Sequence, residues 1–396
     1  MRKPPYRGYI AKIKSMSKAF VFESTSLPWS SLWEQYVDAS TAIAVWRRPQ
    51  ADKRYFLADS TGGAPVENLD LSHFSPGFLV APFIGKPLFF KAEKIFMSDV
   101  PEKKVHALAG FKPFKQSPKR ADFEYWVQAS IEQIKQGNFQ KVVLSRTDEA
   151  PLEADFSVMS SFESLCVEYP NAFVCAIYEP RSQQIWLCAT PEILVSQDAE
   201  GIFKTISLAG TQSAILPDGQ IISSQDARWS QKEIEEQAFV SRYIIECFKK
   251  IRLREYIENG PKTIKAGNLL HLKTEYWVDT KALNYTSLPG VMLDLLHPTS
   301  AVCGTPKEAA IAWISQAEKH ERGFYSGYLG PVNVDHEIHL FVNLRTVKIQ
   351  KNSDGYAATY YAGCGITEDS DPEKEWMETE MKCQTLQRVL NINASV

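Results

Sequence analysis

Apolar residues recur at every third or fourth position in five stretches, the pattern of helices with one buried face. These stretches lie at 32–39, 123–134, 230–252, from 305 onward, and 371–389. Ser230 followed by Glu233 predicts a capping box at the start of the third helix. Thr305 and Pro306 predict an N-cap and first residue for the fourth. Gly137 marks the expected end of the second.

Short apolar runs bounded by turn residues predict strands between these helices. The runs lie at 42–46, 78–84, 142–144, 172–178, 184–188, 192–196, 202–208, 325–333, 337–349 and 356–362. Several follow one another after very short turns, which favours antiparallel pairing because parallel strands need long crossovers. Helices alternating with groups of antiparallel strands predict an α+β chain.

The composition is that of an ordinary globular protein. The chain has 396 residues, of which 44% are hydrophobic and 23% charged, so disordered, collagen-like and rod-like coiled-coil chains are excluded. The length alone suggests two or three domains. The basic, proline-containing stretch 101–120 is the best candidate for an exposed connector.

The charge and cysteine content narrow the class further. Forty-four basic against 47 acidic residues give a net charge of -3, which offers no overall basic surface for nucleic acid. No run approaches the ~20 apolar residues of a membrane helix, and residues 1–20 lack the apolar core of a secretory signal. The seven cysteines are scattered, which predicts reduced thiols and a cytoplasmic protein.

Two predicted helices carry glutamates three residues apart, at Glu233 and Glu236 and at Glu375 and Glu378. Carboxylates at this spacing share a helix face and repel each other. A solvated helix face is the commoner explanation for either pair. If the two pairs converge, oxygen-only ligands favour Mg²⁺.

Three charged residues stand in or beside apolar strands. Burial of Lys141 would lower its pKa and make it a base, although a lysine at a strand edge can also reach water. Glu192 opens a strand, where an apolar pocket would raise its pKa and make it an acid, unless it is a surface residue. Arg345 suggests a carboxylate partner, or else an arginine that reaches past the sheet edge.

Two glycine clusters follow predicted strands. Gly210 with Thr211 ends one strand, and Gly363 with Gly365 ends another just before an acidic helix. Glycine lets a backbone approach an anion closely and offer its N–H groups, although ordinary turns are the commoner explanation.

Taken together, eight ordered motifs resemble the chorismate-utilising enzymes, which include isochorismate synthases, salicylate synthases and the large components of anthranilate and aminodeoxychorismate synthases. The motifs are Lys141-Val-Val-Leu-Ser-Arg146, Ala189-Thr-Pro-Glu192, Ser207-Leu-Ala-Gly-Thr211, Leu296-His-Pro-Thr299, Gly304-Thr-Pro306, Arg322-Gly-Phe-Tyr-Ser-Gly327, Gly363-Cys-Gly-Ile366 and Asp369-Ser-Asp-Pro-Glu-Lys-Glu-Trp376. The resemblance implies two packed antiparallel β-sheets surrounded by helices. It also implies one large domain over 1–396, with a motif-free N-terminal part at 1–115 and a chorismate-binding core at 120–385. The stretch 101–120 would then be an internal loop.

Within the family the chain is most similar to the isochorismate synthases, which add water at C2 of chorismate and expel the C4 hydroxyl. By this resemblance Lys141 activates the water and Glu192 protonates the departing hydroxyl. The implied Mg²⁺ ligands are Glu236 and Glu378, with Glu233 and Glu375 acting through water. The product would feed menaquinone or siderophore synthesis.

The resemblance also assigns the substrate contacts, some of which separate the subclasses. The implied substrate-binding residues are Gly210, Thr211, His297, Ala301, Tyr325, Arg345, Gly363, Gly365 and Lys382. His297 could instead only stabilise its loop. Ala301 stands where ammonia-using members carry threonine, so no glutaminase partner is expected. The chain would be a monomer or weak dimer. Salicylate synthase, an aminating synthase and a chorismate-binding protein without turnover are the alternatives.

Overall fold

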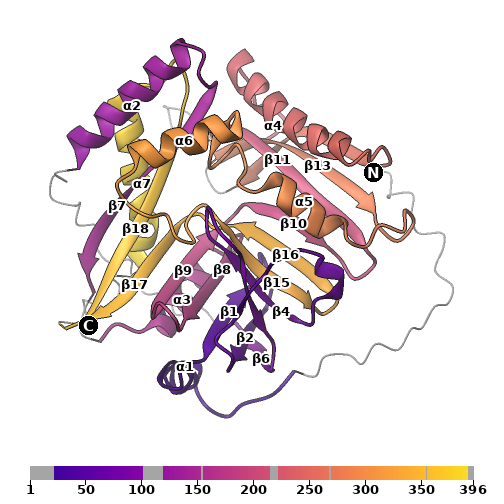
Figure 1. Ribbon diagram of the computed structural model, residues 1–396, viewed down its shortest axis with the longest axis vertical. Coiled ribbons are helices and arrows are strands. Elements are labelled where there is room, and N and C mark those ends of the chain that lie inside the picture. The colour runs from indigo at the N-terminus through magenta and orange to yellow at the C-terminus, as the bar shows by residue number, and fades with distance from the viewer. Residues whose placement is uncertain are drawn as a thin grey trace.

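The computed structural model describes residues 22–100, 119–152, 155–214, 222–266, 269–353 and 355–390. Within these ranges the strands form two nine-stranded sheets, in which every neighbouring pair of strands is antiparallel. The predicted fold class of two packed antiparallel sheets with helices outside is therefore confirmed (Figure 1).

Sheet A and sheet B each combine strands from distant parts of the sequence. Sheet A runs in the order β14 (Gly304–Thr305), β7 (Lys141–Pro151), β18 (Gly355–Ile366), β17 (Thr346–Asn352), β9 (Gln184–Thr190), β8 (Phe173–Glu179), β1 (Ala42–Arg47), β2 (Lys53–Asp59) and β6 (Lys94–Asp99). Sheet B runs β12 (Ile257–Ala266), β13 (Leu269–Asp279), β11 (Ile202–Ser213), β10 (Ile193–Gln197), β16 (Glu337–Val342), β15 (Tyr328–Val334), β4 (Gly77–Ala81), β5 (Leu88–Lys91) and β3 (Ala64–Pro65). Residues 22–100 thus supply strands to both sheets and form no separate sheet.

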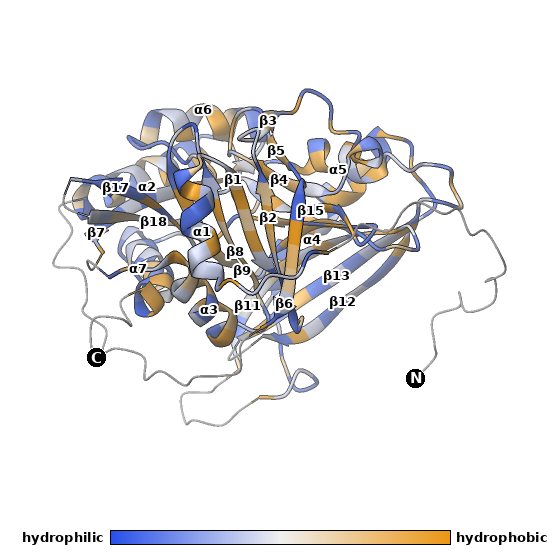
Figure 2. Cartoon of the chain, turned by 90° about the horizontal axis from the view of Figure 1, so that it is seen from below, coloured by the Kyte–Doolittle hydropathy of each residue, from blue (hydrophilic) through white to orange (hydrophobic). Residues whose placement is uncertain are grey.

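The two sheets pack face to face through large apolar side chains. Trp46, Phe173 and Trp186 of sheet A meet Phe78 and Phe341 of sheet B in one buried cluster. The rings of Phe173 and Phe341 stack with centroids 4.2 Å apart. Figure 2 shows apolar residues along strands of both sheets, such as β2 and β15. Burial of this area, at roughly 25 cal/mol per Å², supplies the main stabilisation of such a sandwich.

Helices cover the outer faces of both sheets. They are α1 (Trp29–Asp38), α2 (Arg120–Lys135), α3 (Val158–Glu168), α4 (Gln231–Lys250), α5 (Leu288–Leu296), α6 (Lys307–Ala317) and α7 (Pro372–Leu390), with a 3₁₀ turn η1 at Leu71–His73. α1, α3 and α7 share a core with sheet A, and α4 and α5 share one with sheet B. α2 and α6 pack beside β7 and α7 (Figure 1). None of the helices in the described ranges combines the length and apolar character that crossing a membrane requires.

Local sequence signals located several helix ends correctly. α4 begins with the capping box, in which Ser230 Oγ accepts from Glu233 N and the Glu233 carboxylate accepts from Ser230 N at 2.7 Å. Gly137, just beyond α2, has the left-handed φ of +79° that only glycine adopts easily. The stretch 101–120 lies mostly outside the described residues, and α2 begins at its last residue, Arg120.

Other expectations were wrong for physical reasons. The predicted strand 337–349 is broken into β16 and β17, because the chain passes there from sheet B to sheet A. α6 begins at Lys307 with Pro306 as its N-cap, because Thr305 is already paired in β14. No range was predicted for several elements, among them α3, α5, β2, β5, β6, β12 and β13. α5 has little polar face to reveal it, because six of its nine residues are buried, and β12 is interrupted by a register shift between Asn259 and Lys262.

Candidate active site

Lys141 is the first residue of β7 and lies at the end of sheet A, next to the acidic helices. Its partner across β14 is Thr305. A Cβ on Gly365 of β18 would lie 2.9 Å from Lys141 Cε and 3.4 Å from Nζ, so the lysine side chain crosses directly over that glycine. Burial lowers the pKa of Lys141, and the carboxylates of Glu236 and Glu192 oppose the shift. This is the environment that makes a lysine available as a base.

Glu192 and Arg345 lie where the chain crosses between the sheets. Glu192 separates β9 of sheet A from β10 of sheet B, and Arg345 separates β16 from β17. The crossings are hydrogen-bonded to each other: Val342 N donates to Glu192 O at 2.9 Å, and Ala189 N donates to Arg345 O at 3.1 Å. The backbone therefore fixes the acidic and basic side chains in one local unit.

Glu192 and Arg345 interact electrostatically with each other, and Glu192 also interacts with Lys141. Burial raises the pKa of the Glu192 carboxyl, and the positive charges of Lys141 and Arg345 oppose that shift. Arg345 was expected inside a strand, but it has a left-handed φ of +48° in the break between two strands. Arg345 lines a cavity between β18, α7 and the loop at 299–303, and its irregular backbone directs the side chain there.

A cavity of about 80 Å³ lies between β18, α7 and the loop at 299–303. Six predicted site residues line it: Ala301, Tyr325, Arg345, Gly363, Gly365 and Lys382. Lys382 Nζ donates to the carbonyl oxygen of Gly363 at 2.8 Å and to Glu378 Oε1 at 2.5 Å. The guanidinium and ammonium groups make this a cavity for an anion.

An aromatic pair forms one wall of this anion cavity. Tyr325 stacks on Tyr361, with centroids 5.2 Å apart and an interplanar angle of 21°. Burial raises the pKa of Tyr325 to about 12, so its hydroxyl stays a hydrogen-bond donor. A Cβ on Gly363 would lie 2.8 Å from the Tyr325 hydroxyl and 2.9 Å from Leu144 O, so only glycine fits beneath the ring. Tyr361 was missed by the sequence analysis.

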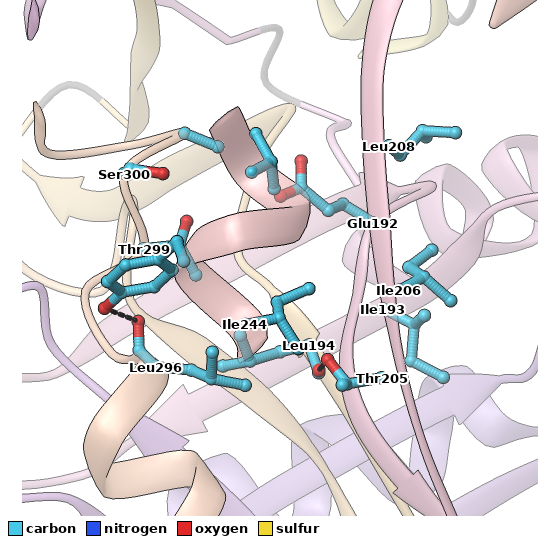
Figure 3. A pocket seen from close by; sticks show the side chains of 13 residues that line it. Glu192, Ile193, Leu194, Thr205, Ile206, Leu208, Ile244, Leu296, Thr299 and Ser300 are labelled. Atoms are coloured by element: carbon cyan, nitrogen blue, oxygen red, sulfur yellow. Dashed lines mark hydrogen bonds between the residues drawn. The ribbon is translucent and has the colours of Figure 1, made fainter. Parts of the chain in front are cut away.

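A second, smaller chamber adjoins the first at Ala301, which lines both. Its volume is about 30 Å³. Glu192 lies on one side of this chamber, and Thr299 and Ser300 lie on the other (Figure 3). The chamber was not predicted, because Thr299 and Ser300 carry no sequence pattern that separates them from ordinary loop residues.

The predicted metal ligands lie on α4 and α7. Glu236 and Glu378 both act on the Lys141 ammonium, so the two helices bring their carboxylates to one neighbourhood. Burial raises the pKa of Glu375, and the nearby Glu378 adds to the shift. Glu233 is instead bound to the N-terminus of its own helix through the capping box.

The described residues fit a magnesium ion held by few protein ligands. No three Asp, Glu, His or Cys side chains within the described ranges gather closely enough to hold a metal by themselves. The arrangement in which Glu236 and Glu378 bind the ion directly, with Glu233 and Glu375 acting through water, stays a prediction. Mg²⁺ commonly takes only one or two carboxylates and completes its octahedron with water and substrate oxygens. Glu236 and Glu378 suit that arrangement.

Three predicted substrate contacts lie outside both cavities. His297 Nε2 is 3.1 Å from the carbonyl oxygen of Pro82, and burial lowers the His297 pKa to about 4. Its ring also packs edge-on against Tyr328, so His297 holds its loop and does not face either cavity. Gly210, at a bulge of β11 with φ +65°, lies against Glu233 of α4, and Thr211 pairs with His271 of β13.

A buried ion pair supports the cavity walls from behind. Arg322 bonds to Glu318, to Val302 O at 2.8 Å and to Val143 O at 2.7 Å. Glu318 Oε1 also accepts from Ser145 N at 2.6 Å. Val143 and Val302 both line the anion cavity, so this pair fixes β7 relative to the loop at 299–303. The motif around Arg322 gave a signal for the arginine, but none for its acidic partner.

Solved structures share this fold. MenF, the menaquinone-specific isochorismate synthase of Escherichia coli, superposes with a TM-score of 0.70 over 92% of each chain at 19% identity. Anthranilate synthase component I of Streptococcus pneumoniae gives a TM-score of 0.63 over 95% of each chain at 17% identity. At such identities the likeness concerns the fold alone.

Sequence comparison gives more specific relatives. A salicylate biosynthesis isochorismate synthase of Pseudomonas aeruginosa is 30% identical over 295 residues, which are 72% of this chain and 57% of that protein. The isochorismate synthase DhbC of Bacillus subtilis is 25% identical over 284 residues, 70% of each chain. The chain therefore spans little more than half of the first relative's length. The family model described as chorismate binding enzyme matches residues 91–391, a range that includes the lining residues of both cavities. This match shows that the chain belongs to the chorismate-binding enzymes.

Proposed function

We propose that this chain is an isochorismate synthase that interconverts chorismate and isochorismate. The observation that carries the proposal is a desolvated lysine and a desolvated carboxyl group beside one anion cavity. Burial lowers the pKa of Lys141 and raises that of Glu192, which favours the neutral form of the base and the protonated form of the acid. The curated relatives from Pseudomonas aeruginosa and Bacillus subtilis carry this activity in their names.

The proposed chemistry needs one proton taken and one proton given. Lys141 removes a proton from a water molecule as its oxygen bonds to C2 of chorismate. The ring double bonds shift, the C4–O bond breaks, and Glu192 delivers its proton to the departing oxygen. The C4 hydroxyl thus leaves as water, and the ring gains a hydroxyl at C2.

The other groups would hold a dianionic substrate. Arg345, Tyr325 and Lys382 border the anion cavity, where they would bind the carboxylate of the pyruvyl side chain. Glu236 and Glu378 would hold Mg²⁺, whose charge would offset that of the ring carboxylate. Ala301 at the junction of the cavities leaves room beside the reacting ring, as expected for a member that uses water. Isochorismate made here would feed menaquinone or siderophore synthesis.

The test is to incubate the purified chain with chorismate and Mg²⁺ and to identify the product by chromatography and mass spectrometry. Isochorismate is the expected product. Salicylate with pyruvate would show a salicylate synthase, an aminated product formed with ammonium would show an aminating synthase, and binding without conversion would show a non-enzyme.

Two variants connect the activity to the site. Lys141→Ala should lower kcat by about 10²–10⁴-fold, the contribution of one general base. Lys53→Ala, which removes an exposed lysine paired with Asp99, should leave kcat unchanged. Glu236→Gln should raise the Mg²⁺ concentration needed for half-maximal activity. A Lys141→Ala enzyme with full activity would refute the assigned base.

A further inference from the structure

The chamber beside Glu192 is lined by a hydroxyl group, that of Thr299, which no other described residue binds. The hydroxyl of Thr299 is buried, and it has no hydrogen-bond partner among the described residues. Two other hydroxyls around the chamber are already bonded: Thr205 Oγ1 donates to Leu194 O at 2.8 Å, and the Tyr243 hydroxyl donates to Leu295 O at 3.0 Å. Buried polar groups usually have a partner, so the Thr299 hydroxyl is suited to bind a small polar ligand in the chamber.

The size of the chamber limits what that ligand can be. The space is about 30 Å³, which is enough to hold a water molecule and too small for a substrate ring. Most of its remaining lining is aliphatic: Ile193, Leu194, Ile206, Leu208, Val240, Ile244 and Leu296. A water molecule there would find its polar partners in Thr299 and Ser300 on one side and in the Glu192 carboxyl on the other (Figure 3).

The position of the chamber relates it to the reaction. It meets the anion cavity at Ala301, and Glu192 is part of its own lining. When Glu192 gives its proton to the C4 oxygen and the C4–O bond breaks, a water molecule forms beside the glutamate. That molecule must leave the reacting carbon without colliding with the ring, and the chamber is the adjacent space of the right size.

We propose that this chamber receives the water expelled from C4 and that the Thr299 hydroxyl hydrogen-bonds to it. The inference rests on the proposed function and names a further residue for it. In the reverse direction the same water is the nucleophile at C4, and the Glu192 carboxylate takes its proton. A retained water molecule therefore allows the original oxygen to return to C4 before it mixes with solvent.

The experiment follows an oxygen label. Chorismate carrying ¹⁸O in the C4 hydroxyl is incubated with enzyme in unlabelled water, and the ¹⁸O content of the recovered chorismate is compared with the extent of reversible conversion. The wild-type enzyme should return part of the label to C4. Thr299→Val keeps the shape but removes the hydroxyl, and should reduce the returned fraction roughly fivefold, the equivalent of one ordinary hydrogen bond.

Two further variants serve as controls. Thr299→Ser restores a hydroxyl and should restore the return of label. Thr280→Val removes another buried threonine hydroxyl, one that is bonded to Gly201 O at 2.7 Å away from both cavities, and should leave the returned fraction unchanged. A structural defect alone would lower the amount of active enzyme without changing the fraction of label returned per conversion.

The possible results distinguish a failure of the proposed function from a failure of the role proposed for the chamber. If the wild-type protein forms no isochorismate, the proposed function fails. If it forms isochorismate but returns no label, or if Thr299→Val returns label like the wild type, the chamber does not hold the leaving water and the inference is overturned. The wild-type measurement alone decides the matter if Thr299→Val does not fold.

Discussion

Gly365 offers the sharpest test of how Lys141 is positioned. An alanine there would place its Cβ 2.9 Å from Lys141 Cε and 3.4 Å from Nζ. Carbon atoms pack best at about 3.5–4.0 Å, so the lysine carbon must move away by roughly 0.5–1 Å. The backbone of Gly365 is not in the left-handed region, so the added methyl group acts through this contact and not through strain.

The displacement has a predictable kinetic size. A misplacement of about 1 Å in a catalytic group costs on the order of 10²-fold in rate. We therefore expect Gly365→Ala to lower kcat by roughly 10–100-fold, while the free energy of unfolding stays near the wild-type value. The flexible lysine side chain can move, and no backbone atom within 4 Å has to yield.

Steady-state kinetics with chorismate, together with urea denaturation, measures both quantities. The chain supplies a matched control in Gly201, where an added Cβ would meet Lys281 Cγ at 2.9 Å far from the cavities. Gly201→Ala should lower stability, because its φ is +87°, but should leave kcat unchanged. In a Lys141→Ala background, Gly365→Ala should have no further effect. An equal loss of kcat in that background would refute the reasoning.

Three more predictions follow from the site. Glu318→Ala leaves Arg322 charged and unpaired at 3% side-chain exposure, and should cost about 3–5 kcal/mol of unfolding free energy in urea denaturation; a loss below ~1 kcal/mol would show that the pair is unimportant. Arg345→Leu should raise the KM for chorismate by roughly 10–100-fold, the value of a charge-assisted hydrogen bond, with Arg345→Lys recovering part of it. The pH profile of kcat should be bell-shaped: activity falls at low pH as Lys141, whose pKa is lowered, becomes protonated, and falls at high pH as Glu192, whose pKa is raised, loses its proton. A flat profile would contradict both roles.

The sequence predicted those parts of the site that lie in strands or follow them directly. Lys141 stands out as a charged residue in an apolar strand. Gly363 and Gly365 stand out as small residues at the end of a strand, where an anion could come close to the backbone. These features are local, since each concerns one residue and its neighbours along the chain. The same holds for the capping box at Ser230, which depends on four consecutive positions.

Contacts between distant segments could not be read in this way. Tyr361 forms a cavity wall because Tyr325, from another part of the chain, stacks on it. Glu318 matters because β7 brings Ser145 to its carboxylate. The sequence also left open which way His297 turns, and the ring is directed to Pro82 O because the loop folds back on that carbonyl.

Glu233 shows how one residue can fit two correct patterns. Its position suits both a capping box and a pair of metal-binding carboxylates, and both patterns were recognised in the sequence. The structure uses the carboxylate for the capping box. The capping box uses Glu233 Oε2, and the predicted contact of this residue with a metal through water stays a prediction.

The way the first hundred residues enter both sheets determines the order in which the chain can fold. β4, at Gly77–Ala81, pairs with β15 at Tyr328–Val334, and β1 pairs with β8. During synthesis β1 can find its partner early, whereas β4 must wait for some 250 further residues. Contacts of such long range slow folding and leave unpaired strand edges exposed meanwhile. A ribosome-bound chain that stops before β15 would therefore present one side of β4 to other proteins, and the second sheet would close only near the end of translation.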